Sequence, residues 1–168
     1  VLERLIPIQV RMLDNVIDLN NIPVLQAQLT NQKYRGIGLG TFGWHHLLAL
    51  KNVEWESEEA IRYADELYEK IAYLTIKASA DLAKEKGAYP AFEGSDWSTG
   101  EYFDKRYAEE ADCGGFSKWG ELKSEIMRTG IRNGYLMAVA PNASTSIIAG
   151  STASIDPIFN IEYSEEKK

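Results

Sequence analysis

Apolar residues recur three or four positions apart at the start of the chain, a spacing that is typical of an amphipathic helix. This pattern ends at the turn formed by residues 20–23, and Pro23 suits the first turn of a second, short helix that extends to about Leu29. The same spacing predicts another helix from Ser117 to about Thr129, in which Leu122 and Ile126 share one face. These patterns indicate a chain rich in helices.

The longest helical pattern lies between Ser57 and Gly87. Ser57 can cap the first turn, and Gly87 can adopt the left-handed conformation that ends a helix. A helix of this length would extend for about 45 Å. Leu67 and Leu74 lie outside its main apolar stripe, so we expect the helix to be covered on two sides. The stripe itself consists of Ile61, Ala64, Tyr68, Ile71, Thr75, Ala78 and Leu82.

Two apolar stretches predict strands. The segment "GIGLGTFG" (residues 36–43) predicts a short strand that runs into a helix from about Phe42 to Leu50. The fully apolar "YLMAVA" (residues 135–140) predicts a strand covered on both faces. Residues 89–115 are aromatic, acidic and rich in Gly and Ser, which predicts a long connection with at most one short helix. Together these elements favour an α/β fold with a few mostly parallel strands.

Composition narrows the classes of function. The 168 residues are 45% hydrophobic, which is enough for a packed core, and the net charge is −7 without a block of Lys or Arg. This charge disfavours a nucleic-acid polymer as partner, although backbone amides can still bind a small phosphate. The single cysteine and the lack of a long apolar run indicate a cytoplasmic protein that does not enter a membrane. Because the chain begins without Met inside a helical pattern, we expect a piece of a longer protein.

Three features that could carry chemistry have simpler explanations. The spacing Gly38-x-Gly40-x-x-Gly43 matches a dinucleotide fingerprint, but the required second strand and its acidic residue would fall inside the long helix. Tight packing is therefore the preferred interpretation of these glycines. His45 and His46 would point about 100° apart on a helix, without a third ligand nearby, so no metal site is predicted. Cys113 lacks the cationic neighbours that activate a thiol, and we expect no catalytic role for it.

The segment "APNASTS" (residues 140–146) is the strongest candidate for a binding site. Pro141 would end the apolar strand, and a helix is predicted to begin near Ser144. The unpaired amide hydrogens of such a helix start favour an anion, and the Ser and Thr hydroxyls can donate as well. The residues alone leave two interpretations open, a phosphate site and a simple helix cap.

Three segments resemble the large (alpha, catalytic) subunit of class I ribonucleotide reductase. They are "RGIGLGTFGWHHLL", "ASADLAKEKGAYPAFEGSDWSTG" and "GIRNGYLMAVAPNASTSIIAGSTASIDP", and they follow one another in the order of the family. The resemblance implies that residues 1–168 are a single segment of a ten-stranded α/β barrel, with its phosphate-loop part at residues 135–157. It also implies that the substrate's diphosphate is bound by Pro141, Asn142, Ala143, Ser144 and Thr145. The sequence departs from the family at three positions. Asn142 stands where Thr or Ser is usual, Gly134 where Ser is usual, and Asp156 where Glu is usual.

The resemblance further implies reduction of ribonucleotides to deoxyribonucleotides, the building blocks for DNA replication, by radical chemistry. Its expected partners are a ribonucleoside diphosphate, a small (beta) radical-generating subunit that contains a metal, and a second alpha subunit. The family's Asn-x-Cys-x-Glu motif, redox cysteine pair and tyrosine pair do not occur in this sequence. We therefore expect no catalytic residue, metal or cofactor in this segment, which should be inactive alone. Two alternatives are a segment of the adenosylcobalamin-dependent reductase and a non-enzymatic helical interaction module.

Overall fold

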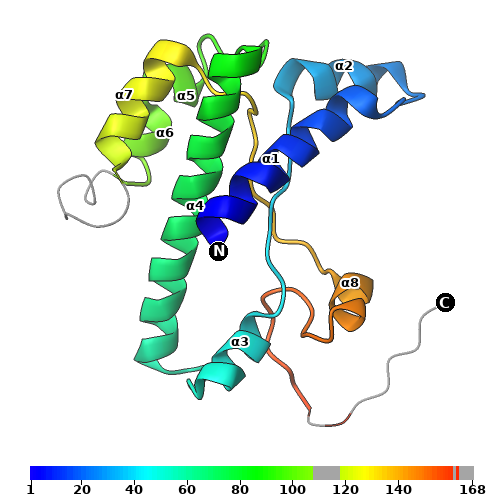
Figure 1. Cartoon of the computed structure of the whole chain (residues 1–168), viewed down its shortest axis with the longest axis vertical. Helices are drawn as coiled ribbons and strands as arrows, with labels where there is room; N and C mark the ends of the chain where they lie inside the picture. The colour runs from blue at the N-terminus through cyan, green and yellow to red at the C-terminus, as the bar shows by residue number, and fades with distance from the viewer. Residues whose placement is uncertain (108–117, 161, 163–168) are drawn as a thin grey trace. The chain divides into compact units, whose positions relative to one another are not determined.

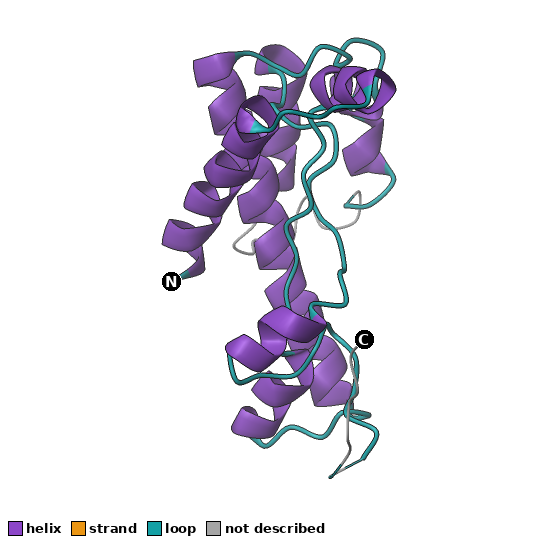
Figure 2. Cartoon of the chain, turned by 90° about the vertical axis from the view of Figure 1, so that its right-hand side faces the viewer, coloured by secondary structure: helices purple, strands orange, loops and turns teal. Residues whose placement is uncertain are grey.

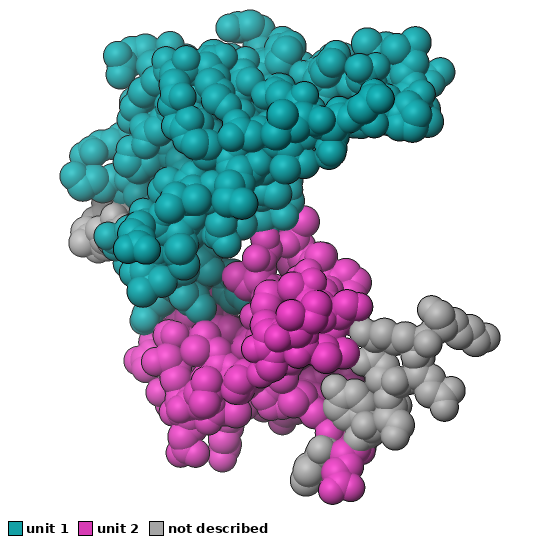
Figure 3. All heavy atoms as spheres, turned by 45° about the vertical axis from the view of Figure 1, so that its right-hand side comes forward, with its two compact units in different colours: residues 1–39, 66–137 teal, residues 40–65, 138–168 magenta. Residues whose placement is uncertain are grey.

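The computed structural model describes residues 1–107, 118–160 and 162, and it shows them as helices and loops (Figure 2). The chain divides into two compact units, which are coloured separately in Figure 3. Unit 1 comprises residues 1–39 and 66–137, and unit 2 comprises residues 40–65 and 138–168. The helices are α1 (Leu2–Leu19), α2 (Leu25–Tyr34), α3 (Trp44–Lys51), α4 (Glu58–Lys86), α5 (Asp96–Thr99), α6 (Glu101–Asp104), α7 (Trp119–Thr129) and α8 (Ala143–Ile148).

Helix α4 confirms the longest sequence pattern. The Ser57 hydroxyl accepts a hydrogen bond from the amide of Ala60 (3.1 Å), and Gly87 has the left-handed φ of 84° expected after the helix. Within unit 1, α4 runs between α1 and α7 (Figure 1). One side of α4 packs on Ile6 and Val10 of α1, and the other packs on the aromatic cluster of α5, α6 and α7. The prediction that this helix is covered on two sides is therefore confirmed.

The other predicted helices differ from the structure mainly at their ends. Helices α1 and α7 occupy their expected ranges, and Leu122 and Ile126 of α7 are buried as expected. Helix α2 begins two residues after Pro23 and continues past Leu29 to Tyr34. The connection after α4 holds two short helices, α5 and α6, instead of at most one. Aromatic packing stabilises these two short helices, since Trp97 of α5 stacks on Tyr102 of α6 with ring centroids 3.7 Å apart.

The predicted α/β fold class is wrong for this chain. Among the described residues the only pairing of extended segments is an isolated parallel bridge between Leu39 and Met137, and no strand forms. Hydrogen bonds from Ile37 N–H to Tyr135 O (2.9 Å) and from Leu39 N–H to Leu136 O (2.8 Å) join the two segments. Continuous ladders are needed for strands, and an apolar run alone does not supply them. The "YLMAVA" run is also not covered on both faces, since Tyr135 is 65% and Val139 is 68% exposed.

A buried polar network fixes the core of unit 1. The carboxylate of Asp14, fully buried on α1, accepts hydrogen bonds from Arg35 (2.8 and 3.0 Å), Asn133 (3.1 Å), Lys86 (3.2 Å) and Arg132 (3.3 Å). Asn133 also donates to the carbonyl oxygen of Arg35 (3.0 Å) and accepts from the Ser79 hydroxyl (2.9 Å). These bonds join α1, α4, the residue after α2 and the start of the extended segment. We call this set of six side chains the Asp14 network.

Candidate phosphate-binding site

The five residues predicted to bind a diphosphate lie together in unit 2 at the start of α8. Asn142 is the residue before the helix and has a left-handed conformation (φ 50°, ψ 28°). Its side chain makes no cap bond to the helix; instead its amide nitrogen donates to the carbonyl oxygen of Ala140 (3.1 Å). Asn is one of the few residue types that tolerate this conformation, which gives a structural reason for Asn at this position. The interpretation of this segment as a simple side-chain cap gains no support from this geometry.

The first three amides of α8 come before the first residue that donates a hydrogen bond within the helix. The earliest of those bonds runs from Ser146 N–H to Asn142 O (2.8 Å), and another runs from Ala149 N–H to Thr145 O (3.0 Å). The amides of Ala143, Ser144 and Thr145 therefore precede the first turn's bonds, as at any helix start. Because Ser144 and Thr145 are exposed, this edge of the segment is accessible to a ligand. The orientation of peptide dipoles at a helix start favours a negative charge there.

The hydroxyl groups of the segment have different roles. Ser146 is 2% exposed, and its hydroxyl donates to the carbonyl oxygen of Ala143 (2.9 Å). Its hydroxyl therefore stabilises the first turn and does not face a ligand. The side chains of Ser144 and Thr145 lie on the surface of α8.

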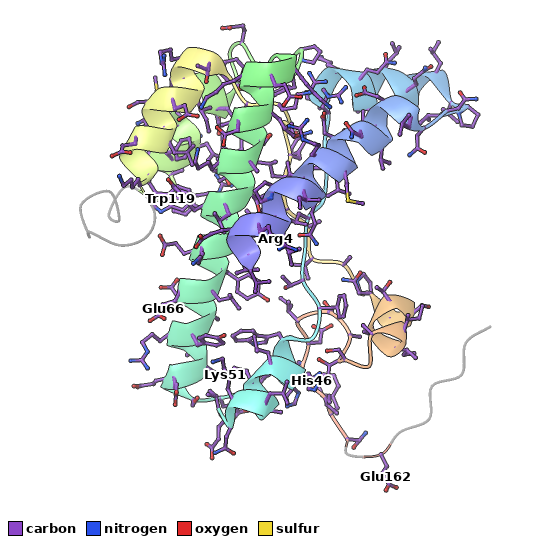
Figure 4. All side chains as sticks on the ribbon, in the orientation of Figure 1. Arg4, His46, Lys51, Glu66, Trp119 and Glu162 are labelled. Carbon is purple, nitrogen blue, oxygen red and sulfur yellow. The ribbon has the colours of Figure 1, made fainter. Side chains whose placement is uncertain are left out.

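Several residues of unit 2 pack against the segments flanking α8, a location that the sequence did not predict. His46 of α3, labelled in Figure 4, has its Nδ1 atom 3.1 Å from the Ser151 hydroxyl. The amide of Gly43 donates to the carbonyl oxygen of Ser154 (3.0 Å). A Cβ atom at Gly43 would overlap the Ser151 hydroxyl, and one at Gly40 would overlap the carbonyl oxygen of Ala138. The glycine spacing was the available signal, and the structure supports its interpretation as tight packing.

The remaining candidates from the sequence were a metal site and a reactive thiol. The part of the chain that the structure describes holds no group of three His, Cys, Asp or Glu side chains able to bind a metal ion. His45 instead accepts a hydrogen bond at Nδ1 from the amide of Ile158 (2.7 Å). Cys113 lies outside the described residues. No described helix combines the length and the apolar character that a membrane span requires.

Comparison with known families decides where the chain belongs. The family model described as "Ribonucleotide reductase, barrel domain" matches residues 1–168. The chain belongs to this family. The resemblance to the reductase alpha subunit seen in the sequence is thus confirmed, whereas the barrel in the family's description has no counterpart among the helices described for this reductase segment.

Curated relatives carry the corresponding name. The chain is 51% identical over 167 residues to the ribonucleoside-diphosphate reductase subunit alpha of Treponema pallidum, a match that covers 99% of this chain and 19% of the relative. It is 43% identical over 172 residues to the ribonucleoside-diphosphate reductase subunit alpha of Helicobacter pylori, a match that covers 98% of this chain and 22% of the relative. It is 37% identical over 153 residues to the ribonucleoside-diphosphate reductase large chain 2 of Saccharomyces cerevisiae, a match that covers 90% of this chain and 17% of the relative. The chain therefore spans about a fifth of these reductase subunits.

Proposed function

We propose that the chain is a segment of the alpha subunit of a ribonucleoside-diphosphate reductase, which reduces ribonucleotides to deoxyribonucleotides by radical chemistry. Support comes from the family match along all 168 residues and from the names of the bacterial and yeast relatives. These names favour this proposal over an adenosylcobalamin-dependent reductase and over a non-enzymatic interaction module. In the full-length subunit, the partners would be a ribonucleoside diphosphate, a small beta subunit and a second alpha subunit.

Within that subunit, we assign binding of the substrate's diphosphate to Pro141, Asn142, Ala143, Ser144 and Thr145. The observation that carries this assignment is the accessible start of α8, where three consecutive amides precede the first helical hydrogen bond. Each charge-assisted hydrogen bond to a phosphate oxygen would contribute about 1.5–3 kcal/mol. Pro141 has no amide hydrogen, so its role is to shape the approach to Asn142. The exposed hydroxyl of Thr145 can supplement the amide donors.

This segment would bind the substrate and would not supply the reacting groups. Its one cysteine, Cys113, has no Asn-x-Cys-x-Glu context, so a reactive cysteine would have to come from another part of the subunit. The radical that starts the reaction would come from the metal-containing small subunit. The 168 residues alone, mixed with that small subunit and labelled CDP, should give no deoxycytidine product.

Two matched substitutions in the full-length subunit test the diphosphate site. Ala143→Asp places a carboxylate at the first residue of α8, and Ala149→Asp places the same group directly after its last residue. Two unit charges about 4 Å apart repel by on the order of 1–4 kcal/mol, so Ala143→Asp should raise the Kd for CDP roughly ten-fold or more. Ala149→Asp should leave the Kd within about two-fold, because it is remote from the amide donors.

This pair separates binding from folding. A carboxylate favours the start of a helix and disfavours its end, so Ala143→Asp should stabilise α8 while it weakens CDP binding. Equilibrium binding of CDP, with circular dichroism as the check on folding, measures both effects. Equal affinities for the two variants would disprove the assignment of the diphosphate to the start of α8.

A further inference from the structure

Gly43 and His46 lie in unit 2 and have no role in the proposed function. We propose that Gly43 and His46 are positioning residues that hold the start of α8 in the geometry needed for the diphosphate. They do so by binding Ser151, Thr152 and Ser154, the residues that follow α8. We call these five residues the α3 clasp, and their proposed role rests on the assignment of the diphosphate to the start of α8.

The α3 side of the clasp uses the first turn of that helix. Gly43 precedes α3 with a left-handed φ of 81°, and its amide donates to the carbonyl oxygen of Ser154 (3.0 Å). His46 lies in the first turn of α3, where an amide has no carbonyl acceptor inside the helix. Its amide makes a long contact with the Thr152 hydroxyl (3.4 Å). The His46 ring adds the contact between Nδ1 and the Ser151 hydroxyl (3.1 Å). The main chain and one side chain of this short segment thus bind three residues of the loop, Ser151, Thr152 and Ser154.

A continuous series of contacts links the clasp to the proposed binding residues. The amide of Ser151 donates to the carbonyl oxygen of Ser146 (2.9 Å). Ser146, buried in the middle of this series, donates from its amide to Asn142 O (2.8 Å) and from its hydroxyl to Ala143 O (2.9 Å). A movement of Ser151 would therefore be transmitted through Ser146 to Asn142 and Ala143.

The segment before α8 is held by the same part of the chain. Gly40 lies so close to the carbonyl oxygen of Ala138 that a Cβ atom could not be placed between them. Residues 40–46 therefore contact the chain both before and after the proposed binding residues. These close contacts explain Gly40 and Gly43 without a dinucleotide site.

A helix as short as α8 needs such anchors. It has six residues, and helices shorter than about 12 residues are marginal in water without tertiary support. Donors that bind a phosphate without rearranging must also be held in place before the ligand arrives. The α3 clasp supplies this support through contacts within the chain.

The test uses four variants of the full-length subunit: His46→Leu, His46→Asn, Ser151→Ala and the double variant His46→Leu/Ser151→Ala. Loss of one hydrogen bond in the series should raise the Kd for CDP by about three- to ten-fold in His46→Leu and in Ser151→Ala. The double variant should be no weaker than the weaker single variant, because both remove the same contact. His46→Asn should restore near wild-type affinity, since the Asn side chain carries a polar atom at the position of Nδ1. Turnover at saturating CDP should stay unchanged in all four variants.

Three results would overturn the proposal. They are an unchanged Kd in His46→Leu, additive losses in the double variant, and a loss in His46→Leu that His46→Asn does not restore. Ala143→Asp is measured in parallel to separate this proposal from the one on which it rests. If Ala143→Asp weakens binding and His46→Leu does not, the clasp alone is disproved. If Ala143→Asp has no effect, the diphosphate site itself is disproved.

Discussion

Two polar regions of this chain differ in composition and in how their hydrogen-bonding groups are used. The Asp14 network in unit 1 and the start of α8 in unit 2 both concentrate charges or hydrogen-bond donors at one place. In the Asp14 network, one buried carboxylate accepts hydrogen bonds from four different side chains. At the start of α8, three amides stand before the first helical bond at an exposed edge.

The comparison shows how polar groups that stabilise the fold can be distinguished from polar groups that are available to a ligand. Buried polar groups that the chain itself satisfies rigidify a core, and removing one of them leaves its partners without compensation. Donors at an exposed helix start cost little in the folded chain because water replaces the ligand. The first region should therefore respond to substitution with a loss of stability, and the second with a loss of ligand affinity.

The largest effect is expected from Asp14→Ala. It removes the shared acceptor of Arg35, Lys86 and Arg132. Among the described residues, the buried guanidinium of Arg35 then keeps only Asp18 as a charged partner. Breaking a buried ion pair from one side costs about 3–5 kcal/mol. Native-state hydrogen exchange of the full-length subunit should show this loss of stability in the peptides of α1 and α4.

Asp18→Ala is the matched control for this substitution. Asp18 also binds Arg35 (2.8 Å), but its side chain is 53% exposed. A half-exposed pair of this kind contributes about 1 kcal/mol or less. Similar losses for Asp14→Ala and Asp18→Ala would show that burial does not set the importance of the Asp14 network.

Acid should weaken the same network without a mutation. Burial acts to raise the pKa of Asp14, but the hydrogen bonds and charge of Arg35 and the charge of Arg132 outweigh it, so this pKa lies below its usual value. The unfolded chain, in which the carboxyl has an ordinary pKa of about 3.9, then binds the proton more readily than the folded chain. The contribution of Asp14 to stability is therefore complete above about pH 4 and is lost as the pH falls through the folded-state pKa.

Comparison with Asp14→Asn isolates this contribution from that of other carboxylates. Urea unfolding of both proteins between about pH 6 and pH 3 should show a smaller loss of stability in the variant, which has no carboxyl to protonate at this position. Parallel pH profiles would mean that Asp14 keeps an ordinary pKa in the folded chain.

The sequence predicted those parts of the fold that depend on local bonds. Helices α1, α4 and α7 were found from apolar spacing because their hydrogen bonds close within the segment. The two predicted strands did not form. A strand depends on a partner that can lie anywhere in the chain, and among the described residues the pairing stops at one bridge. The end of α2 was missed because α2 buries none of its residues and so has no apolar pattern to mark its length.

The sequence predicted where α8 begins better than it predicted the polar contacts elsewhere in the chain. The run of small polar residues after an apolar stretch located the start of α8 within one residue. The Asp14 network was not predicted, because its members are up to 119 positions apart. One local signal existed, since Ile6, Val10 and Asp14 recur every four residues and all lie on the buried face of α1. A charge at the third position of such a stripe indicates a buried ionic partner.

The smallest effects are expected at Asn142, where two substitutions distinguish backbone shape from side-chain contact. Asn142→Gly keeps the left-handed conformation and removes only the exposed bond to Ala140, so the Kd for CDP should stay within about two-fold. Asn142→Val places a branched side chain in a left-handed backbone conformation, which costs a non-glycine residue about 1–2 kcal/mol. The Kd for CDP should therefore rise by about three- to ten-fold. Titration of CDP into the full-length subunit measures both values. If the Gly variant binds as weakly as the Val variant, the Asn142 side chain itself contacts the diphosphate, and the amides of α8 are not sufficient for binding.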